Sequence, residues 1–248
     1  MPLHDAYRRW LATALLAFAA PAGALEYYEG VAVARNGGQL LYRESHWIDA
    51  HGGRLVLYRC PGGAAFARKR VATPGPAPDF ELFDARHGYR EGVRTDGGAR
   101  EVFRQQGADA REHRQPLPSG AGIIDAGFDA YIREHWDELA QPRRVGVLLP
   151  SRLRTMDVRL GALASPHADT RRYQLSLDAW YGAALPTLVA TYSVADRRLL
   201  RFEGIGNIRD AEGRYPAVRI DFPARTRRVA APAEWKAADA MALVARCD

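Results

Sequence analysis

The sequence contains few residue patterns that could perform chemistry. Nucleophilic catalysis requires a serine or cysteine beside a base, and the G-x-S-x-G motif that presents a catalytic serine does not occur. Ser45 and His46 are adjacent in a segment with strand periodicity, so their side chains are expected on opposite faces, which argues against a Ser–His pair. Cys60 follows Arg59, whose charge could lower the pKa of the thiol, but a buried or disulfide-bonded cysteine is the favoured interpretation.

Several carboxyl groups are candidates for acid–base chemistry, because two carboxyl groups that meet in space can divide the roles of acid and base. The sequence does not rank the candidates, which are Asp79, Asp84, Asp125 and Asp129. The acidic segment 210–213 lacks the spaced oxygen ligands of a calcium loop and is predicted to be a turn.

Metal binding requires clustered ligands, whereas the histidines of this chain are dispersed and no H-E-x-x-H motif occurs. The densest run of ligand-type residues is 134–138. There His135 falls on the apolar side of a predicted helix, and Glu134 and Glu138 fall on the solvent side. A half-buried histidine is the favoured interpretation. We therefore assign no catalytic residue, no metal ligand and no cofactor from the sequence.

The two cysteines, Cys60 and Cys247, are candidates for a disulfide. An even cysteine count in a chain with an export signal favours a bond in an oxidising compartment. The sequence does not place the two Cα atoms within bonding distance, so two buried free thiols remain the alternative.

An apolar stripe marks the clearest helix, which is predicted over 127–139. Asp125 is the expected N-cap and Pro142 ends the segment. The stripe either fills the core or lines a ligand cavity, and its candidate cavity residues are Phe128, Tyr131, Ile132 and Trp136.

The remaining sequence alternates with period two and is broken by glycine-containing turns, which is typical of antiparallel strands joined by hairpins. Short strands are predicted over 27–35, 39–49, 54–60, 65–72, 79–84, 89–94, 99–105, 143–149, 155–160, 171–177, 187–194, 199–207 and 218–222. A second helix is predicted over 233–246, with 243–247 as an alternative edge strand. We expect a mainly β (α+β) fold: a large curved antiparallel sheet or open barrel around one central amphipathic helix.

Composition sets the broad class. The 248 residues are 47% hydrophobic and 26% charged, which is ordinary for a soluble globular protein and excludes a disordered chain or a polytopic membrane protein. The net charge is +6, but the basic residues are scattered among acidic ones and are interpreted as a solvated surface, including the run 68–70. No nucleic-acid partner is predicted, because no basic stripe or known module is present.

Residues 1–24 have the pattern of a secretory signal peptide. Arg8 and Arg9 precede an apolar run over 10–20, and cleavage is predicted after Ala24. An uncleaved membrane anchor is the alternative, but the apolar run is too short to span a bilayer. We expect a periplasmic protein with no transmembrane segment after cleavage. Residues 25–248 should form a single β-rich domain in which 107–122 is a candidate linker.

Two segments resemble a known family. In 185–192 a Leu-Pro pair opens a strand, and 197–204 forms a second strand after a turn. This pattern resembles periplasmic proteins of the lipoprotein-carrier type and related uncharacterised envelope families. The resemblance implies an unclosed antiparallel barrel that wraps around helices and shelters acyl chains. It assigns no functional residue in this chain.

These observations favour a non-enzymatic exported protein that binds a hydrophobic small molecule or lipid in an open barrel. The alternative is an exported hydrolase with a site assembled from loops, for which Asp125, Asp129 and His135 are the residues to test. An outer-membrane barrel is disfavoured, because arginines interrupt most of the strands. The oligomeric state is left open.

Overall fold

The computed structural model describes residues 24–177 and 187–247. Most of the predicted signal peptide, over 1–23, lies outside the described residues, as do 178–186 and the terminal residue 248.

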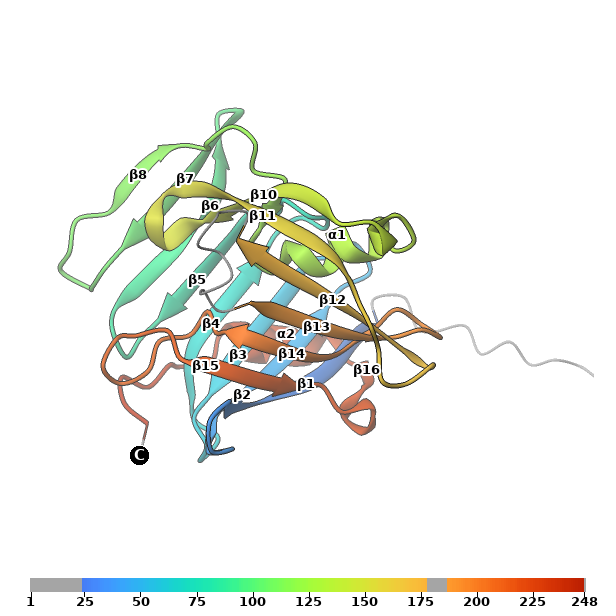
Figure 1. Ribbon diagram of the computed structural model, residues 1–248. Helices are drawn as coiled ribbons and strands as arrows, with labels where there is room; N and C mark the ends of the chain where they lie inside the picture. Colours follow the sequence, from blue (N-terminus) through green and yellow to red (C-terminus); the bar gives the residue numbers. More distant parts are fainter. Residues whose placement is uncertain (1–23, 178–186, 248) are drawn as a thin grey trace, which may run out of the picture.

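Strands dominate the described residues and form a single sheet (Figure 1). They are β1 (Leu25–Ala34), β2 (Leu40–Ile48), β3 (Arg54–Arg59), β4 (Ala65–Val71), β5 (Phe80–Asp84), β6 (Tyr89–Asp96), β7 (Ala99–Gln105), β8 (His113–Pro116), β9 (Ile123–Ile124), β10 (Arg143–Leu149), β11 (Arg154–Leu163), β12 (Thr170–Leu177), β13 (Leu188–Ser193), β14 (Leu199–Ile205), β15 (Ala217–Asp221) and β16 (Arg228–Ala230).

The sheet is a meander with one long-range step. Its order is β8-β7-β6-β5-β4-β3-β2-β1-β15-β14-β13-β12-β11-β10-β9, and β16 pairs with β1. The long-range step joins β1 to β15, with Val31 opposite Asp221 and Ala34 opposite Val218. Every pairing is antiparallel except that of β9 with β10. Strand β1 is therefore the seam between the first and last parts of the chain.

The two ends of this order do not close into a hydrogen-bonded ladder within 24–177 and 187–247, so the sheet is an open barrel. Side chains link its edges instead. Arg104 of β7 donates to the Ser151 carbonyl at 2.5 Å, and Gln115 of β8 donates to the Leu153 carbonyl at 2.7 Å. Both carbonyls belong to the turn between β10 and β11. Figure 1 shows the resulting curl, with β12–β15 facing β2–β4.

This architecture confirms the predicted mainly β open barrel. The prediction missed the short strands β8, β9 and β16, whose sequences carry too few residues for a period of two to be visible. Strand β8 lies within the candidate linker 107–122 and extends the sheet beyond β7.

The helices are shorter than predicted. Helix α1 spans Phe128–Glu134 and is followed by a 3-10 turn over Glu138–Ala140, so the expected helix over 127–139 is interrupted. The predicted cap is wrong: Gly127 is the N-cap and no side chain caps the helix, because the Asp125 carboxylate is bonded elsewhere. Helix α2 spans Pro232–Asp239, and the following residues form neither a longer helix nor an edge strand.

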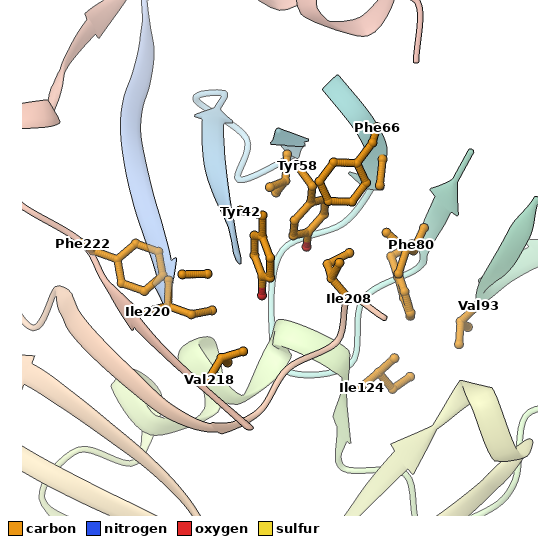
Figure 2. Close-up of a cluster of buried hydrophobic side chains, with 14 of the residues drawn as sticks. Tyr42, Tyr58, Phe66, Phe80, Val93, Ile124, Ile208, Val218, Ile220 and Phe222 are labelled. Carbon is orange, nitrogen blue, oxygen red and sulfur yellow. The ribbon is translucent and has the colours of Figure 1, made fainter. Parts of the chain in front are cut away.

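An aromatic cluster fills one end of the barrel (Figure 2). Tyr42 lies near the start of β2, Tyr58 near the end of β3 and Phe66 near the start of β4, which is the same end of these antiparallel strands. The Tyr42 and Tyr58 rings meet edge to face at 5.9 Å between centroids. Ile208, which follows β14, is also buried in this cluster. This end of the barrel is a packed core.

A second cluster joins α1 to β10–β13. Trp136 meets the rings of Tyr173 and Tyr192 edge to face at 5.4 and 5.8 Å, and the Tyr173 hydroxyl donates to the Trp136 carbonyl at 2.8 Å. Ile132 and Leu139 are fully buried beside them. The apolar stripe therefore anchors the α1 region to one wall of the barrel.

The outer surface of β1–β4 is covered by the C-terminal region. Trp235 and Ala238 of α2 pack against Leu55 and Leu57 of β3. This second layer explains why four consecutive residues of β3 are buried, whereas a strand with one wet face alternates.

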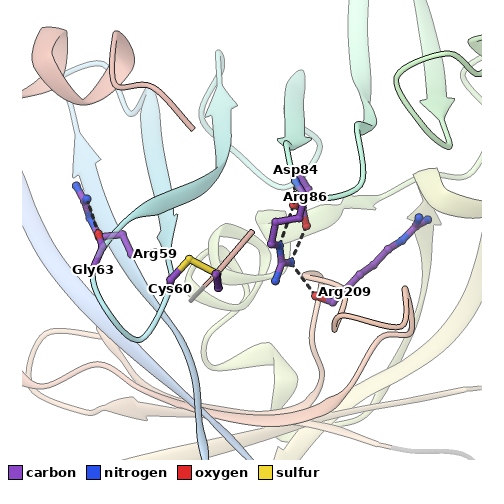
Figure 3. Close-up of a disulfide and its surroundings, with 7 residues drawn as sticks. Arg59, Cys60, Gly63, Asp84, Arg86 and Arg209 are labelled. Carbon is purple, nitrogen blue, oxygen red and sulfur yellow. Dashed lines mark hydrogen bonds and ion pairs between the residues drawn. A yellow bond between two sulfur atoms is a disulfide. The ribbon is translucent and has the colours of Figure 1, made fainter. Parts of the chain in front are cut away.

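The C-terminus is tied to the packed end by the Cys60–Cys247 disulfide, which confirms the predicted bond (Figure 3). Val244 also donates its backbone N–H to the Ala65 carbonyl at 2.8 Å. Nearby, Arg86 bonds to Asp84 and to the Arg209 carbonyl. The last residues thus join β3 and β4 to the remainder of the core.

The disulfide should contribute strongly to stability, because it links cysteines separated by 187 residues. Replacing both cysteines, in Cys60→Ser/Cys247→Ser, should lower the free energy of unfolding by roughly 2–5 kcal/mol, since the crosslink restricts the unfolded chain. Thermal unfolding with and without reductant measures this. Reductant should destabilise the wild type and leave the double variant unchanged. Equal stability of the two proteins under oxidising conditions would contradict the prediction.

Candidate functional site

The barrel encloses a cavity of about 720 Å³. Volumes of this size are typical of sites for small organic ligands. Strands from both sides of the β1–β15 seam line it, together with residues of the turn before α1 and of α1 itself. The cavity has two chemically different walls.

The apolar wall comes from β10–β15. Each of these strands contributes apolar side chains to it, and β10 contributes three consecutive residues. Its members are Val147, Leu148, Leu149, Met156, Val158, Leu175, Leu177, Leu188, Leu199, Phe202, Ile205 and Ile220.

The charged wall comes from β2–β4, β6 and the start of the α1 region. Its members are Glu44, His46, Arg54, Lys69, Glu91, Asp125, Asp129 and Arg133. Charged groups are costly to bury unless they are paired or hydrogen-bonded. Their partners therefore determine what this wall can bind.

A buried ion pair lies at the centre of the charged wall. Lys69 Nζ contacts both carboxylate oxygens of Asp125 at 2.9 and 2.7 Å, and the Lys69 side chain is only 2% exposed. Asp125 has a left-handed backbone conformation with φ of 50°, which aspartate tolerates better than most residues. Gly127 allows close approach to the β4–β5 loop, because a Cβ there would lie 1.9 Å from the Pro76 carbonyl oxygen.

Glu91 is the buried carboxyl group with a strongly shifted pKa. Its pKa is raised from 4.5 to about 7, chiefly by burial and also by the nearby Asp125. The Tyr89 hydroxyl donates to Glu91 at 2.6 Å, and this hydrogen bond and the Lys69 charge oppose the shift. Glu91 therefore gains and loses its proton near neutral pH inside the cavity.

Glu44 and His46 form a second buried pair. They are two residues apart on β2, so both side chains face the interior, where His46 Nε2 and Glu44 Oε2 are 2.8 Å apart. Burial lowers the pKa of His46, although the hydrogen bond to Glu44 partly opposes this. The His46 ring stacks on Tyr28 at 4.5 Å between centroids, and its Nδ1 has no partner among the described residues.

Arg54 lies at the other end of the charged wall from the aromatic cluster. Its guanidinium is 3.6 Å from the Asp129 carboxylate, which is beyond hydrogen-bond distance. The same carboxylate oxygen accepts a hydrogen bond from Arg133 at 2.5 Å. Asp129 thus bonds to Arg133 and only neutralises Arg54 at longer range.

The structure separates the four residues predicted as candidate cavity lining. Phe128 lines the cavity, where its ring lies 5.8 Å from that of Phe202. Ile132 and Trp136 are buried in the second cluster, and Tyr131 packs against its edge. These three are not among the residues that line the cavity in the described part of the chain.

The hydrolase candidates are only partly brought together. Asp125 and Asp129 share the cavity, whereas His135 lies outside it, next to Glu138 and Arg143. Asp79 and Asp84 also lie elsewhere, paired with arginines.

Neither Cys60 nor Ser45, the two nucleophiles considered from the sequence, joins these carboxylates. Cys60 is in the disulfide. Ser45, which precedes His46 on β2, accepts a hydrogen bond from Arg59. No group of three or more His, Cys, Asp or Glu side chains in 24–177 and 187–247 is arranged to hold a metal ion.

Sequence reasoning missed Arg54, Lys69 and Glu91 as site residues. Lys69 belongs to the basic run 68–70, and its interpretation as solvated surface is wrong, since Lys69 is one of the most buried side chains. The alternation of side chains along a strand could have identified Lys69. Arg68 and Arg70 contact the C-terminal region on the outside, so the residue between them faces inward.

No protein-family model matches the sequence, and no curated protein does. A solved structure is similar. It is the crystal structure of a beta-barrel-like protein of the domain of unknown function DUF1849 from Brucella abortus, with 9% sequence identity and a TM-score of 0.47. The alignment covers 84% of this chain and 97% of that one. None of these comparisons shows a lipoprotein carrier, so that resemblance stays a prediction.

Helices in the described parts of the chain give no membrane span: none combines the length and apolar character needed to cross a bilayer.

The Lys69–Asp125 pair should be needed for folding. Asp125→Asn keeps a side chain that tolerates the left-handed backbone but removes the charge, which leaves Lys69 buried without a counterion. We expect a loss of roughly 3–5 kcal/mol in the free energy of unfolding. Denaturant titration measures it.

Asp239→Asn is the matched control, because it removes the partner of the exposed Arg70 and should cost at most about 1 kcal/mol. A loss at Asp125 no larger than this would show that the buried pair is energetically neutral.

Glu91 should make stability depend on pH. Its pKa is about 7 in the folded protein against 4.5 ordinarily, so the folded state binds more protons in this window and the free energy of unfolding falls as pH rises through it. Glu91→Gln should therefore stabilise the protein on the order of 3 kcal/mol at about pH 8 and have little effect at about pH 4.

Denaturant titrations at several pH values measure the difference. Tyr89→Phe removes the hydrogen bond that favours the carboxylate, so it should move the window to higher pH. A Glu91→Gln effect that is the same at every pH would refute this assignment.

Proposed function

We propose that this protein is a non-enzymatic binding protein whose open barrel takes up an amphipathic, lipid-like ligand. The observation that carries the proposal is the cavity of about 720 Å³ with one apolar and one charged wall. The apolar part of the ligand lies against β10–β15, where leucine, valine and methionine side chains replace water. The polar part lies against β2–β4 and β6.

Packing supports an open cavity and not a filled core. The aromatic cluster fills one end of the barrel and the α1 region fills another part, yet protein side chains do not fill the space between them. A collapsed core would be closely packed and would not leave a volume this large. The apolar side chains around the empty space are therefore available to a ligand.

Export to the periplasm, with cleavage after Ala24, is part of the proposal. It is supported by the signal-peptide pattern and by the Cys60–Cys247 disulfide, because such bonds persist in oxidising compartments. A binding protein in that compartment could hold an apolar chain away from water.

Leu199→Trp should weaken uptake of an apolar ligand, because Leu199 lines the cavity and a larger side chain occupies its volume. The neutral dye N-phenyl-1-naphthylamine, which fluoresces in apolar surroundings, measures uptake. We expect saturable binding by the wild type and at least roughly tenfold weaker binding by the variant, which corresponds to about 1.4 kcal/mol.

Leu200→Trp is the matched control, because Leu200 is the next residue of β14 and does not line the cavity among the described residues. It should bind the dye as the wild type does. Absence of saturable uptake by the wild type, together with a ligand-free native mass spectrum after gentle purification, would overturn the proposed function.

A further inference from the structure

We infer that the ligand is an anionic amphiphile whose acid group binds Arg54 inside the barrel. The inference rests on the proposed function and goes further, because it assigns the chemistry of the polar group and the residue that recognises it. The shared chemistry is an acid group on an apolar chain, and a carboxylate and a phosphate are its two sources.

The hydrogen-bond donors of Arg54 are unused. Its side chain is 19% exposed and lines the cavity, and its nearest carboxylate among the described residues is that of Asp129, at 3.6 Å. Within 24–177 and 187–247 no protein acceptor lies within hydrogen-bond distance of this guanidinium. A guanidinium has five N–H donors in a planar fork, and leaving them unpaired away from water is costly.

Three other cations of the cavity have close partners. Lys69 contacts both oxygens of Asp125, and Arg227 contacts Glu26 at 2.5 Å. Arg133 contacts Asp129 at 2.5 Å and is more exposed than Arg54. Arg152, Arg154 and Arg198 also line the cavity, but all three are exposed. Arg54 is therefore the enclosed cation that is left to receive a ligand.

The local charge also favours an acid group over a basic one. Seven arginine and lysine side chains and five aspartate and glutamate side chains line the cavity, which leaves an excess of positive charge. Glu44, which lies on the adjacent strand β2, is bonded to His46. A carboxylate or phosphate would balance the excess charge and could accept two parallel hydrogen bonds from the guanidinium.

Apolar surface begins directly beside Arg54. Tyr28 lies between the charged groups, with its ring stacked on His46 and in edge contact with Phe222 at 5.9 Å. From Phe222 and Ile220 the lining continues along β14 to β10. An acid group at Arg54 thus has a path for its chain along the apolar wall.

Displacement of N-phenyl-1-naphthylamine tests the inference with ligands that share one alkyl chain and differ in the polar group. The probes are palmitate, hexadecyl phosphate, hexadecanol and hexadecyltrimethylammonium, each below its micelle-forming concentration. The wild type should be displaced by at least one acid at a concentration at least roughly tenfold lower than by the alcohol or the cation. The stronger of the two acids identifies the source.

Arg54→Gln should abolish the preference for acids over hexadecanol while the neutral dye still binds. Arg54→Lys, which keeps the charge but loses the planar fork, should retain part of the preference and provides a second variant if the first folds poorly. Arg90→Gln is the control, because Arg90 pairs with Glu81 on the surface and does not line the cavity among the described residues.

The outcomes separate the two claims. If the dye binds and hexadecanol displaces it as well as the acids do, the acid preference is wrong and the binding function stands. If Arg54→Gln and Arg54→Lys both keep the full preference, Arg54 is not the recognising residue. If the wild type takes up no dye and no amphiphile, the proposed function fails and this inference fails with it.

Discussion

The cavity depends on a charge pair that is held out of water. Lys69 points inward from β4 and can be buried there only because Asp125 places both carboxylate oxygens against it. Asp125 reaches this position through a left-handed backbone conformation, and Gly127 lets the same turn approach Pro76 closely. The ion pair and this turn fix where the chain crosses the barrel before α1. Helix α1 then covers one part of the interior and leaves the rest open.

The sheet remains open because other interactions hold its edges. Strand β1 joins the first and last parts of the chain through backbone pairing with β15, and the disulfide ties the C-terminus to the end of β3. At the opposite edge, Arg104 and Gln115 bond to backbone carbonyls of the β10–β11 turn. A ladder would fix this edge in one register, whereas these side-chain bonds hold it without closing the sheet. The barrel can therefore enclose a cavity larger than its own side chains fill.

The two walls of the cavity come from two parts of the sheet that differ in their outer covering and in their inward side chains. Strands β1–β4 have a second layer outside, formed by the α2 region, so they are buried on both faces. Their inward positions carry charged residues, of which Glu44 pairs with His46 and Lys69 pairs with Asp125. Strands β10–β15 contribute mainly leucine, valine and isoleucine side chains to the cavity, with Arg154 at the start of β11. A molecule with an apolar chain and a polar group matches both walls at once, which a purely apolar or purely polar molecule does not.

Local patterns in the sequence determined the strands, the turns and the class of fold. Alternation and glycine turns are properties of a few neighbouring residues, so they predicted the meander and the open barrel without knowledge of distant contacts. The disulfide could be suggested but not placed, because its cysteines are far apart in the chain. The helix over 127–139 was predicted too long, because the helical spacing of apolar residues continues past Glu134, where the helix ends.

Only the tertiary structure decided which polar residues form the site. Lys69 has the sequence surroundings of a solvated basic run, and Glu91 and Arg54 have no distinguishing neighbours. Their roles arise from strands far apart in the sequence that curl around one volume. The burial and the partners of each charged side chain determine how it behaves. Both depend on residues across the barrel, which no local sequence pattern encodes.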